Sequence, residues 1–380
     1  MSSPAVASPA AAPRGLPQRL TRAARRVAIH AVPVTFTAWL IGATAGTRLW
    51  AADFTHSFLP AAALLLHGHS PYPPLSAPPS GSAFVYPPLL AIALLPFAVA
   101  PSWIASAVFV VLVFAALAGT LLALGVRDLR CYSIALLWPA VVATVQTASI
   151  SLALALAVAL AWRWRAMPRR QVAVVALAIV AKLFLWPLLI WLAAIGGLRR
   201  GVAAGAAATA VGLGSWMAIG FAGLDSYVPL LRRLGAAEGP TGYTFSHLSA
   251  AAGLGAGAGT AVAYATAACL LAAVWVTGRR GHAAESLALC LAAALIASPI
   301  VWLHYFALLL VPVALAAPTL SRLWLLPCVA LLAGPAVGPN HRPVAVLVVL
   351  AVAAMTTGLA IRSLRISRTG VASPVGADPT

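Results

Sequence analysis

The chain has 380 residues, of which 62% are hydrophobic and only 8% are charged, and its mean hydropathy is +0.99. Soluble globular proteins carry about 25% charged residues, so this composition excludes an ordinary water-facing surface and predicts an integral membrane protein. The net charge of +18 raises the question of a nucleic-acid partner. The placement of the arginines answers it.

The arginines lie in short clusters between apolar runs. The clusters fall at 14–26, 163–170, 199–200, 279–280 and 362–368. Cytoplasmic loops of membrane proteins carry such an excess of positive charge. We therefore expect a lipid bilayer and no nucleic acid as partner, and we place both chain ends in the cytoplasm.

The predicted fold class is all-α, a polytopic transmembrane helical bundle of about ten to twelve spans. Lipid-facing spans must satisfy their own backbone hydrogen bonds, which favours helices, and Trp103 to Gly125 lacks the alternation of a barrel strand. The apolar runs lie at about 27–47, 84–100, 102–124, 131–162, 171–181, 183–197, 202–221, 255–277, 284–298, 303–317, 322–338 and 344–361.

Composition divides the chain into three parts. Residues 27–365 form the predicted transmembrane domain, and the segments 1–26 and 366–380 are predicted disordered cytoplasmic tails. Two long loops interrupt the domain, at 48–83 and 222–253. With the amino terminus inside, the first loop lies outside the membrane.

The middle of the domain leaves two topologies open. The run 131–162 is long for one span and is either a single helix or two short helices that meet near Gln146 to Ser151. The runs 171–181 and 183–197 are short, and they are either two spans or one broken pair.

The first outer loop contains an amphipathic stretch, 58–66, which predicts a short helix on the membrane surface. Aromatic rings are favoured at the lipid headgroups. We expect this position for Phe54, Phe58, Tyr72 and Tyr86.

Asp53 has the most unusual position among the six acidic residues, because it follows the first apolar run at the outer membrane face. A carboxylate near hydrocarbon is costly unless it is solvated or paired. Asp53 is therefore either a helix cap or interfacial charge, or a functional carboxylate.

Three further positive or aromatic features are candidates for a site. Lys182, the only lysine, interrupts an apolar stretch and either snorkels from a helix end or contacts a phosphate or carboxylate. Trp302, His304 and Tyr305 form either an aromatic belt or the wall of a polar pocket, in which His304 donates to a phosphate or a sugar hydroxyl. Arg232 lies in the second outer loop, where a phosphate ligand would explain an arginine.

The sequence contains no nucleotide-binding glycine loop, no HExxH and no CxxC, and its four cysteines are widely spaced. We therefore expect no cofactor and no metal. A donor that is already activated when it reaches the outer face fits better than a nucleotide, because nucleotides remain in the cytoplasm.

Several segments in a fixed order resemble the polytopic GT-C glycosyltransferases, and most closely the actinobacterial group that includes the phosphatidylinositol-mannoside mannosyltransferase and arabinofuranosyltransferases. The resemblance covers about residues 30 to 320. Its landmarks are Asp53-Phe54, Gly68-His69-Ser70-Pro71-Tyr72, Phe84-Val85-Tyr86-Pro87-Pro88-Leu89, Leu95-Pro96, Gln146, Lys182 with Pro187 and Arg199-Arg200, and Ser298-Pro299 with Trp302, His304 and Tyr305.

The resemblance implies transfer of a sugar from a polyprenyl-phosphate donor to a glycolipid or glycan acceptor, with inversion, at the outer face of the plasma membrane. Likeness to the phosphatidylinositol-mannoside mannosyltransferase favours mannose as this sugar. Asp53 would be the general base and His304 a second catalytic residue. The implied substrate-binding residues are Lys182, Tyr72, Tyr86, Trp302, Tyr305, Arg232 and Gln146. The reaction also needs positively charged protein groups next to the leaving phosphate, because these groups stabilise its negative charge.

Two other functions remain open from the sequence. The same fold with arabinofuranose as the sugar is one of them. A lipid or solute transporter is the other, although it would predict two related halves with discontinuous helices, and no such repeat is evident in the sequence.

Overall fold

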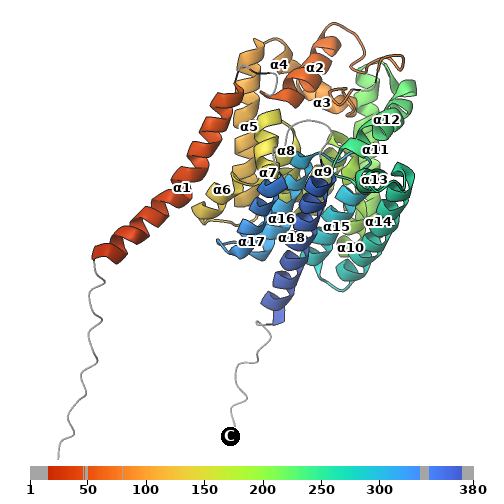
Figure 1. The fold of residues 1–380 in the computed structure, drawn as a ribbon. Helices are drawn as coiled ribbons and strands as arrows, with labels where there is room; N and C mark the ends of the chain where they lie inside the picture. The colour runs from red at the N-terminus through yellow and green to blue at the C-terminus, as the bar shows by residue number, and fades with distance from the viewer. Residues whose placement is uncertain (1–15, 46, 48–49, 79, 334–341, 370–380) are drawn as a thin grey trace, which may run out of the picture.

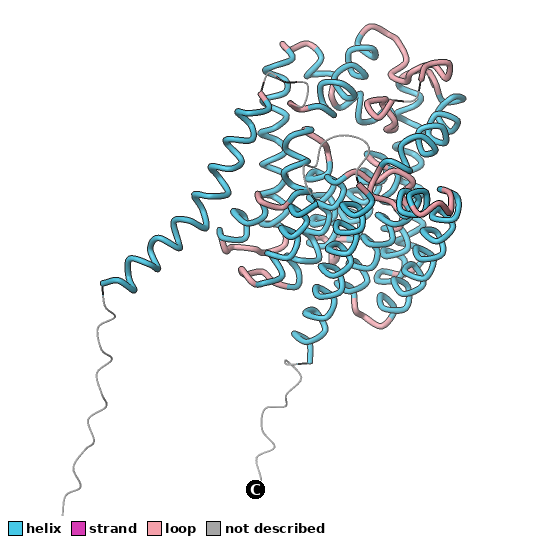
Figure 2. Tube along the Cα trace, viewed as in Figure 1, coloured by secondary structure: helices cyan, strands magenta, loops and turns pink. Residues whose placement is uncertain are grey.

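The long apolar runs of the sequence fold into helices, as a backbone that faces lipid requires. The computed structural model describes residues 16–45, 47, 50–78, 80–333 and 342–369, and within these ranges every regular element is a helix (Figures 1 and 2). The predicted all-α transmembrane bundle is confirmed.

The helices of the amino-terminal half are α1 (Leu16–Thr44), the π-helix η1 (Phe54–Phe58), α2 (Leu59–Leu66), α3 (Pro88–Ala93), α4 (Leu95–Ala98), α5 (Ser102–Ala123), α6 (Leu129–Ala135), α7 (Pro139–Thr147), α8 (Ser151–Arg163), α9 (Pro168–Ala181), the 3-10 helix η2 (Leu183–Leu185) and α10 (Leu188–Gly196). They are followed by α11 (Leu198–Ala218), α12 (Leu224–Glu238), η3 (Gly239–Thr241), α13 (Phe245–Ala251), α14 (Ala256–Arg279), α15 (Ala283–Ala297), η4 (Leu303–Leu309), α16 (Leu310–Ala316), α17 (Arg322–Leu325), η5 (Leu326–Ala333) and α18 (Pro343–Thr369).

Both terminal helices extend beyond the predicted domain boundaries. α1 begins at Leu16 instead of residue 27, and α18 continues to Thr369 instead of ending at residue 365. The predicted disorder of 1–15 and 370–380 concerns residues outside the described ranges.

Among the described residues, five helices are long and apolar enough to cross a bilayer: α1 from Val27, α5, α11, α14 and α18 to Ile366. The pair α6 and α7, bent by 69°, makes a sixth if it is one span. The other apolar helices have only 10–17 residues. The structure therefore contains fewer full-length spans than the about ten to twelve expected from residue count, because breaks divide the remaining apolar runs.

Two of these breaks lie in the segments for which the sequence left the number of helices open. The run 131–162 contains separate helices, because Ala148 adopts a left-handed φ of 49° after α7 and the chain restarts as α8. The next two apolar runs are divided at Lys182, where α9 ends in extended backbone (φ −156°, ψ 107°). The break after α7 lies where the two-helix alternative put it, near Gln146 to Ser151, but the run is divided once more by the 69° bend between α6 and α7. The break at Lys182 makes the runs 171–181 and 183–197 separate short helices.

The arginine clusters meet at one end of the bundle, which we call the arginine end. Arg200 donates to the carbonyl of Arg165 at 3.2 Å and to Oε1 of Gln171 at 3.0 Å. Arg365 of α18 donates to the buried Glu285 of α15 at 2.9 Å. The first turns of α1 and the last turns of α18 point to this end (Figure 1).

The long loops gather at the opposite end, which we call the loop end. Arg233 of α12 donates to the carbonyl of Ala77 at 3.3 Å, and the N–H of Tyr243 donates to the carbonyl of Val301 at 2.8 Å. These bonds join both long loops and the segment after α15 into one layer, which lies beside α2, α3 and α12 (Figure 1).

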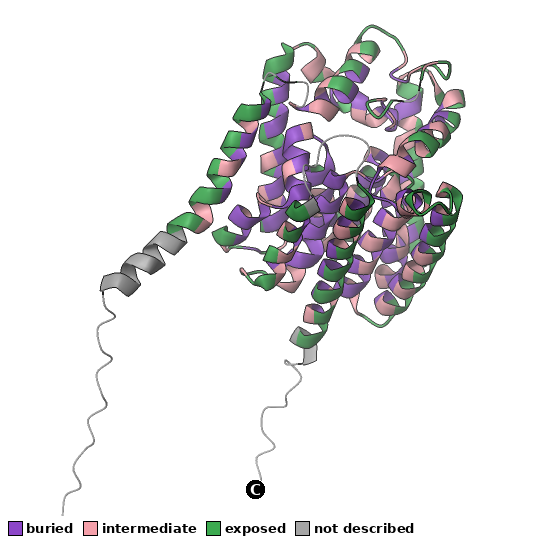
Figure 3. Cartoon of the chain, viewed as in Figure 1, coloured by how far each residue is buried: buried purple, intermediate pink, exposed green. Residues whose placement is uncertain are grey.

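Buried residues fill the centre of the bundle, and the outward faces of α1, α14 and α18 are largely exposed (Figure 3). Large apolar side chains on these faces, such as Trp39 and Val262, fit contact with lipid. The four loop-end aromatic residues expected at the headgroups have their side chains buried in protein. Phe54 and Phe58 have no exposed surface, and Tyr72 and Tyr86 retain 6% and 8%, because they pack on one another and on neighbouring rings.

We predict that Gly242→Ala lowers the free energy of unfolding by about 1–3 kcal/mol, because overpacking a tight contact forces the backbone apart. A Cβ at this position would lie 2.8 Å from the carbonyl oxygen of Val301. The matched control is Gly212→Ala in α11, where an added Cβ meets no atom within 4 Å. Thermal unfolding of the two purified variants in detergent measures the difference, and equal midpoints would contradict the prediction.

Candidate active site

The Asp53 segment is anchored to the break between α7 and α8. Ala51 has a left-handed φ of 49°, and its N–H donates to the carbonyl of Gln146 at 2.7 Å. The carbonyl of Ala51 accepts from the N–H of Thr55 at 2.8 Å, which starts the next helical turn. The helix break predicted from the sequence therefore holds the backbone two residues before the carboxylate.

Asp53 and His304 lie against each other, with 3.7 Å between the carboxylate Oδ2 and the imidazole Nε2. They come from distant parts of the chain, one before η1 and the other in η4. His304 is almost fully buried, whereas the Asp53 side chain retains 30% of its surface. Both line a small cavity of about 40 Å³ together with Ser57, Glu238 and Trp302, which we call the base chamber.

Burial raises the pKa of the Asp53 carboxyl group from its ordinary value to about 6. The positive charge of Lys182 and the hydroxyl of Thr147 oppose this shift, because both favour the charged form. Asp53 is therefore poised near neutral pH, where a general base is most effective.

Lys182 lines a second, larger cavity of about 260 Å³, which we call the lysine chamber. Its ammonium group lies 3.6 Å from the ring centre of Tyr305 and 5.2 Å from that of Tyr86. It is buried, and among the described residues it has no hydrogen-bond partner. A buried ammonium group held only by ring faces retains free donors for an anion.

The two chambers share one wall. Val85, Tyr86, Ile300 and Tyr305 line both of them. The hydroxyl groups of two other tyrosines fix this wall from behind, because Tyr72 donates to the carbonyl of Tyr86 at 2.8 Å and Tyr227 donates to the carbonyl of Val85 at 3.0 Å. A base and a cation are thus placed on either side of two aromatic rings.

Of the nine residues predicted for the site, six line the two chambers: Asp53, Lys182, Tyr86, Trp302, His304 and Tyr305. The other three lie elsewhere. Tyr72 stacks on Trp216 behind the shared wall, Gln146 acts through its backbone carbonyl, and Arg232 is exposed on α12. Neither Gln146 nor Arg232 lines either chamber.

Two residues that were not predicted for the site contribute to this arrangement: Glu238 lines the base chamber, and Tyr227, like Tyr72, supports the shared wall. Both belong to the second long loop, which folds as α12 and turns back over the first loop. Glu238 could have been selected from the sequence because it is one of only six acidic residues in the chain.

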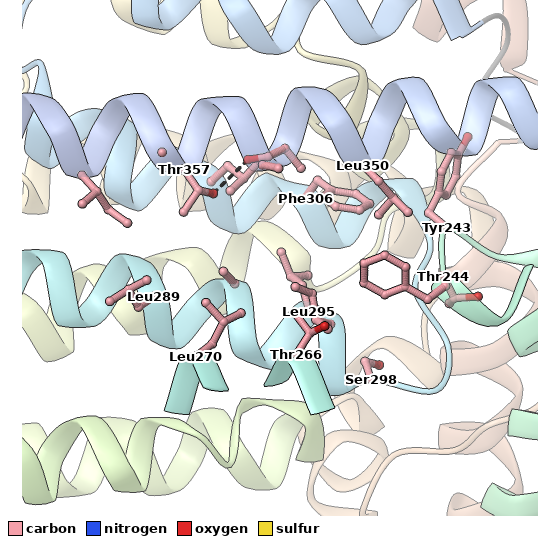
Figure 4. A pocket seen from close by; sticks show the side chains of 18 residues that line it. Tyr243, Thr244, Thr266, Leu270, Leu289, Leu295, Ser298, Phe306, Leu350 and Thr357 are labelled. Carbon is pink, nitrogen blue, oxygen red and sulfur yellow. Dashed lines mark hydrogen bonds between the residues drawn. The ribbon is translucent and has the colours of Figure 1, made fainter. Parts of the chain in front are cut away.

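A third cavity of about 350 Å³ is mostly apolar and lies between α14, α15 and α18. Figure 4 shows the side chains that surround it, from Leu289 to the Tyr243 and Thr244 end. We call it the apolar groove. Ser298 lines both this groove and the lysine chamber, so the two cavities meet at that residue.

No group of three or more His, Cys, Asp or Glu side chains that could hold a metal ion is found in the described ranges. The charged or titratable groups that line the two chambers include the carboxylates of Asp53 and Glu238, the imidazole of His304 and the ammonium group of Lys182.

The fold is that of a membrane glycosyltransferase. The chain is a member of glycosyltransferase family 87, whose family model matches residues 84–299, more than half of the chain. No curated protein and no solved structure matches the chain. The match includes Tyr86, Lys182 and Glu238, while Asp53 and His304 lie on either side of it. The expectation of a glycosyltransferase is confirmed, and the transporter alternative is set aside.

We predict that kcat/KM for sugar transfer falls as the pH decreases through about 6, because protonated Asp53 cannot accept a proton. Lys182→Met should move this acid limb to higher pH, since the charge that lowers the pKa of Asp53 is removed. Lys182→Arg keeps the charge and should leave the limb near its original position. If the acid limb of the pH profile stays at the same pH in Lys182→Met, the assignment of this limb to Asp53 is wrong.

Proposed function

We propose that this glycosyltransferase transfers mannose from a polyprenyl-phosphate donor to a hydroxyl group of a glycolipid or polysaccharide acceptor, with inversion at the anomeric carbon. The observation that carries the proposal is the pairing of Asp53 with His304 beside a chamber that contains an unpartnered ammonium group. The choice of mannose rests on the resemblance to the phosphatidylinositol-mannoside mannosyltransferase group.

The reaction needs one base. The Asp53 carboxylate accepts the proton of the acceptor hydroxyl, and the oxygen attacks the anomeric carbon. The bond from that carbon to the phosphate oxygen breaks, and its electron pair leaves with polyprenyl phosphate. Because phosphate is a good leaving group, an inverting transfer needs no second carboxylate as an acid. His304 donates to the sugar or the phosphate from the other side of Asp53.

The leaving phosphate requires positive charge that is held in place before the reaction. Lys182 supplies it, since its ammonium group is buried in the lysine chamber without a hydrogen-bond partner among the described residues. The aromatic wall of Tyr86 and Tyr305 fixes the ammonium position. A charge-assisted hydrogen bond to phosphate then forms without reorganisation.

The apolar groove is suited to the prenyl chain of the donor. Two of the helices that line it, α14 and α18, are long and apolar enough to span the bilayer, and it meets the lysine chamber at Ser298. A chain that occupied the groove would place its phosphate next to Lys182. A long prenyl chain would contact many of the apolar side chains that line this groove, and these packing contacts would hold it in place.

The side of the membrane follows from charge. Excess arginine remains in the cytoplasm, so the arginine end faces the cytoplasm and the loop end faces outward. Asp53 and the chambers lie at the loop end, and this position supports a reaction on the extracytoplasmic side of the plasma membrane.

Asp53→Asn is expected to reduce kcat by about 10²–10⁴-fold, the usual contribution of general base catalysis, while the protein stays folded. The experiment supplies purified enzyme with radiolabelled polyprenyl-phosphate-mannose or, in a second arm, polyprenyl-phosphate-arabinofuranose, together with an envelope lipid extract. The labelled product identifies the sugar.

The control for this experiment is Asp225→Asn, an exposed acid of α12 that lines neither chamber. It should retain wild-type turnover. Normal turnover by Asp53→Asn would remove Asp53 from the mechanism, and transfer from the arabinofuranose donor alone would replace mannose as the substrate.

Ala292→Trp in α15 should raise the KM for a donor with a long prenyl chain by about tenfold or more, because the indole narrows the apolar groove and excludes several methylene groups. The KM for a donor with a two-isoprene chain should change little. Ala272→Trp, on the exposed face of α14, is the control. Equal effects of Ala292→Trp on both donors would show that the chain binds elsewhere.

A further inference from the structure

The base chamber contains a second carboxylate that the reaction described above does not use. Glu238 ends α12 and lines the chamber together with Asp53, Trp302 and His304. One acid is sufficient for an inverting transfer, so a second one beside the base requires a separate explanation.

The carboxylate of Glu238 is not neutralised by a neighbouring cation. Within the described ranges, no lysine, arginine or histidine lies at ion-pair distance from it. Among the described residues, its carboxylate accepts a hydrogen bond only from the hydroxyl of Thr241, 3.4 Å from Oε2, and that hydroxyl also donates to the Glu238 carbonyl at 3.0 Å. Most of its accepting capacity is therefore free.

Gly81 lies close to the carboxylate, so that a side chain at this position would press on it. A Cβ added at Gly81 would lie 3.3 Å from Oε1 of Glu238 and 3.5 Å from its Oε2. Gly81 lines the same chamber, and so does the half-buried indole of Trp302. A free carboxylate next to an aromatic face is a typical arrangement for binding a sugar, whose hydroxyl groups donate hydrogen bonds and whose ring packs on the indole.

We propose that Glu238 and Trp302, which line the base chamber together, form the subsite that binds the sugar of the acceptor glycan. This inference rests on the proposed function. Glu238 accepts hydrogen bonds from hydroxyl groups of the acceptor sugar other than the reacting one, and Trp302 packs against the sugar ring.

The geometry of inversion favours the acceptor over the donor sugar. The acceptor oxygen must approach the anomeric carbon from the side opposite the leaving phosphate. Lys182 lines only the lysine chamber, and Glu238 lines only the base chamber, with the wall of Tyr86 and Tyr305 between them. With the phosphate on the Lys182 side, the acceptor enters from the Glu238 side and reaches Asp53 directly.

The test compares Glu238→Gln with wild type in full-length enzyme, using radiolabelled polyprenyl-phosphate-mannose as donor and an envelope glycolipid extract as acceptor. Hydrogen bonds to a charged group are roughly twice as strong as neutral ones, so the apparent KM for the acceptor should rise about tenfold. The KM for the donor should be unchanged, and kcat should change less than about threefold.

Gly81→Ala is the second variant, because its methyl group presses on the Glu238 carboxylate without changing the charge. It should also raise the acceptor KM and leave the donor KM unchanged. Asp225→Asn, on the same helix as Glu238 but outside the chamber, should alter neither constant. Thermal unfolding in detergent shows whether each variant is folded, and Gly81→Ala decides the question if Glu238→Gln is not.

An unchanged acceptor KM in both folded variants would overturn the subsite. A rise in the donor KM alone would overturn it as well, since Glu238 would then bind the donor sugar. If wild-type enzyme transfers sugar from neither polyprenyl-phosphate donor, the proposed function fails and takes the subsite with it. Wild-type transfer that depends on Asp53 but not on Glu238 overturns the subsite alone.

Discussion

Burial of the Asp53 carboxylate beside the imidazole of His304 is the constraint on which the rest of the site depends. A carboxylate near hydrocarbon is costly, and the fold limits this cost by leaving part of the side chain exposed to the base chamber and by placing a positive charge nearby. The same burial raises the pKa of the group, which makes it a better base near neutral pH. The backbone is fixed independently of the carboxylate, through the bond from Ala51 to the carbonyl of Gln146.

The helix breaks explain how an apolar bundle accommodates polar chemistry. Backbone that leaves the helix in a membrane protein is tolerated where it is buried in protein or lines a cavity. The break after α7 holds the Asp53 segment, and the break after α9 places Lys182 in extended backbone at the lysine chamber. The short helices are therefore a requirement of the site, which explains why so few full-length spans remain.

The aromatic wall separates the two kinds of charge that the reaction uses. If Asp53 and Lys182 formed a direct ion pair, the carboxylate would be a weak base and the ammonium group would be less available to phosphate. Tyr86 and Tyr305 line both chambers and contact Lys182 through their rings. The phenols of Tyr72 and Tyr227 hold the backbone of this wall, so packing distant from the reacting atoms maintains the separation.

The sequence by itself determined that this is a membrane protein and that it is helical, because 62% hydrophobic residues and 8% charged residues permit only a lipid-facing helical fold. It also singled out Asp53, Lys182 and His304, because charged or titratable groups are rare in such a chain. Only the tertiary structure decided which candidates meet. Residues 53, 238 and 304 line one chamber, and residue 182 lines the chamber that shares a wall with it. The folded chain also buries four aromatic residues that were expected at the headgroups, and it leaves Arg232 exposed. Apolar periodicity fixes which segments are helices, but the packing of helices that are apolar on every face depends on side-chain shape and helix breaks, which the hydropathy pattern does not record.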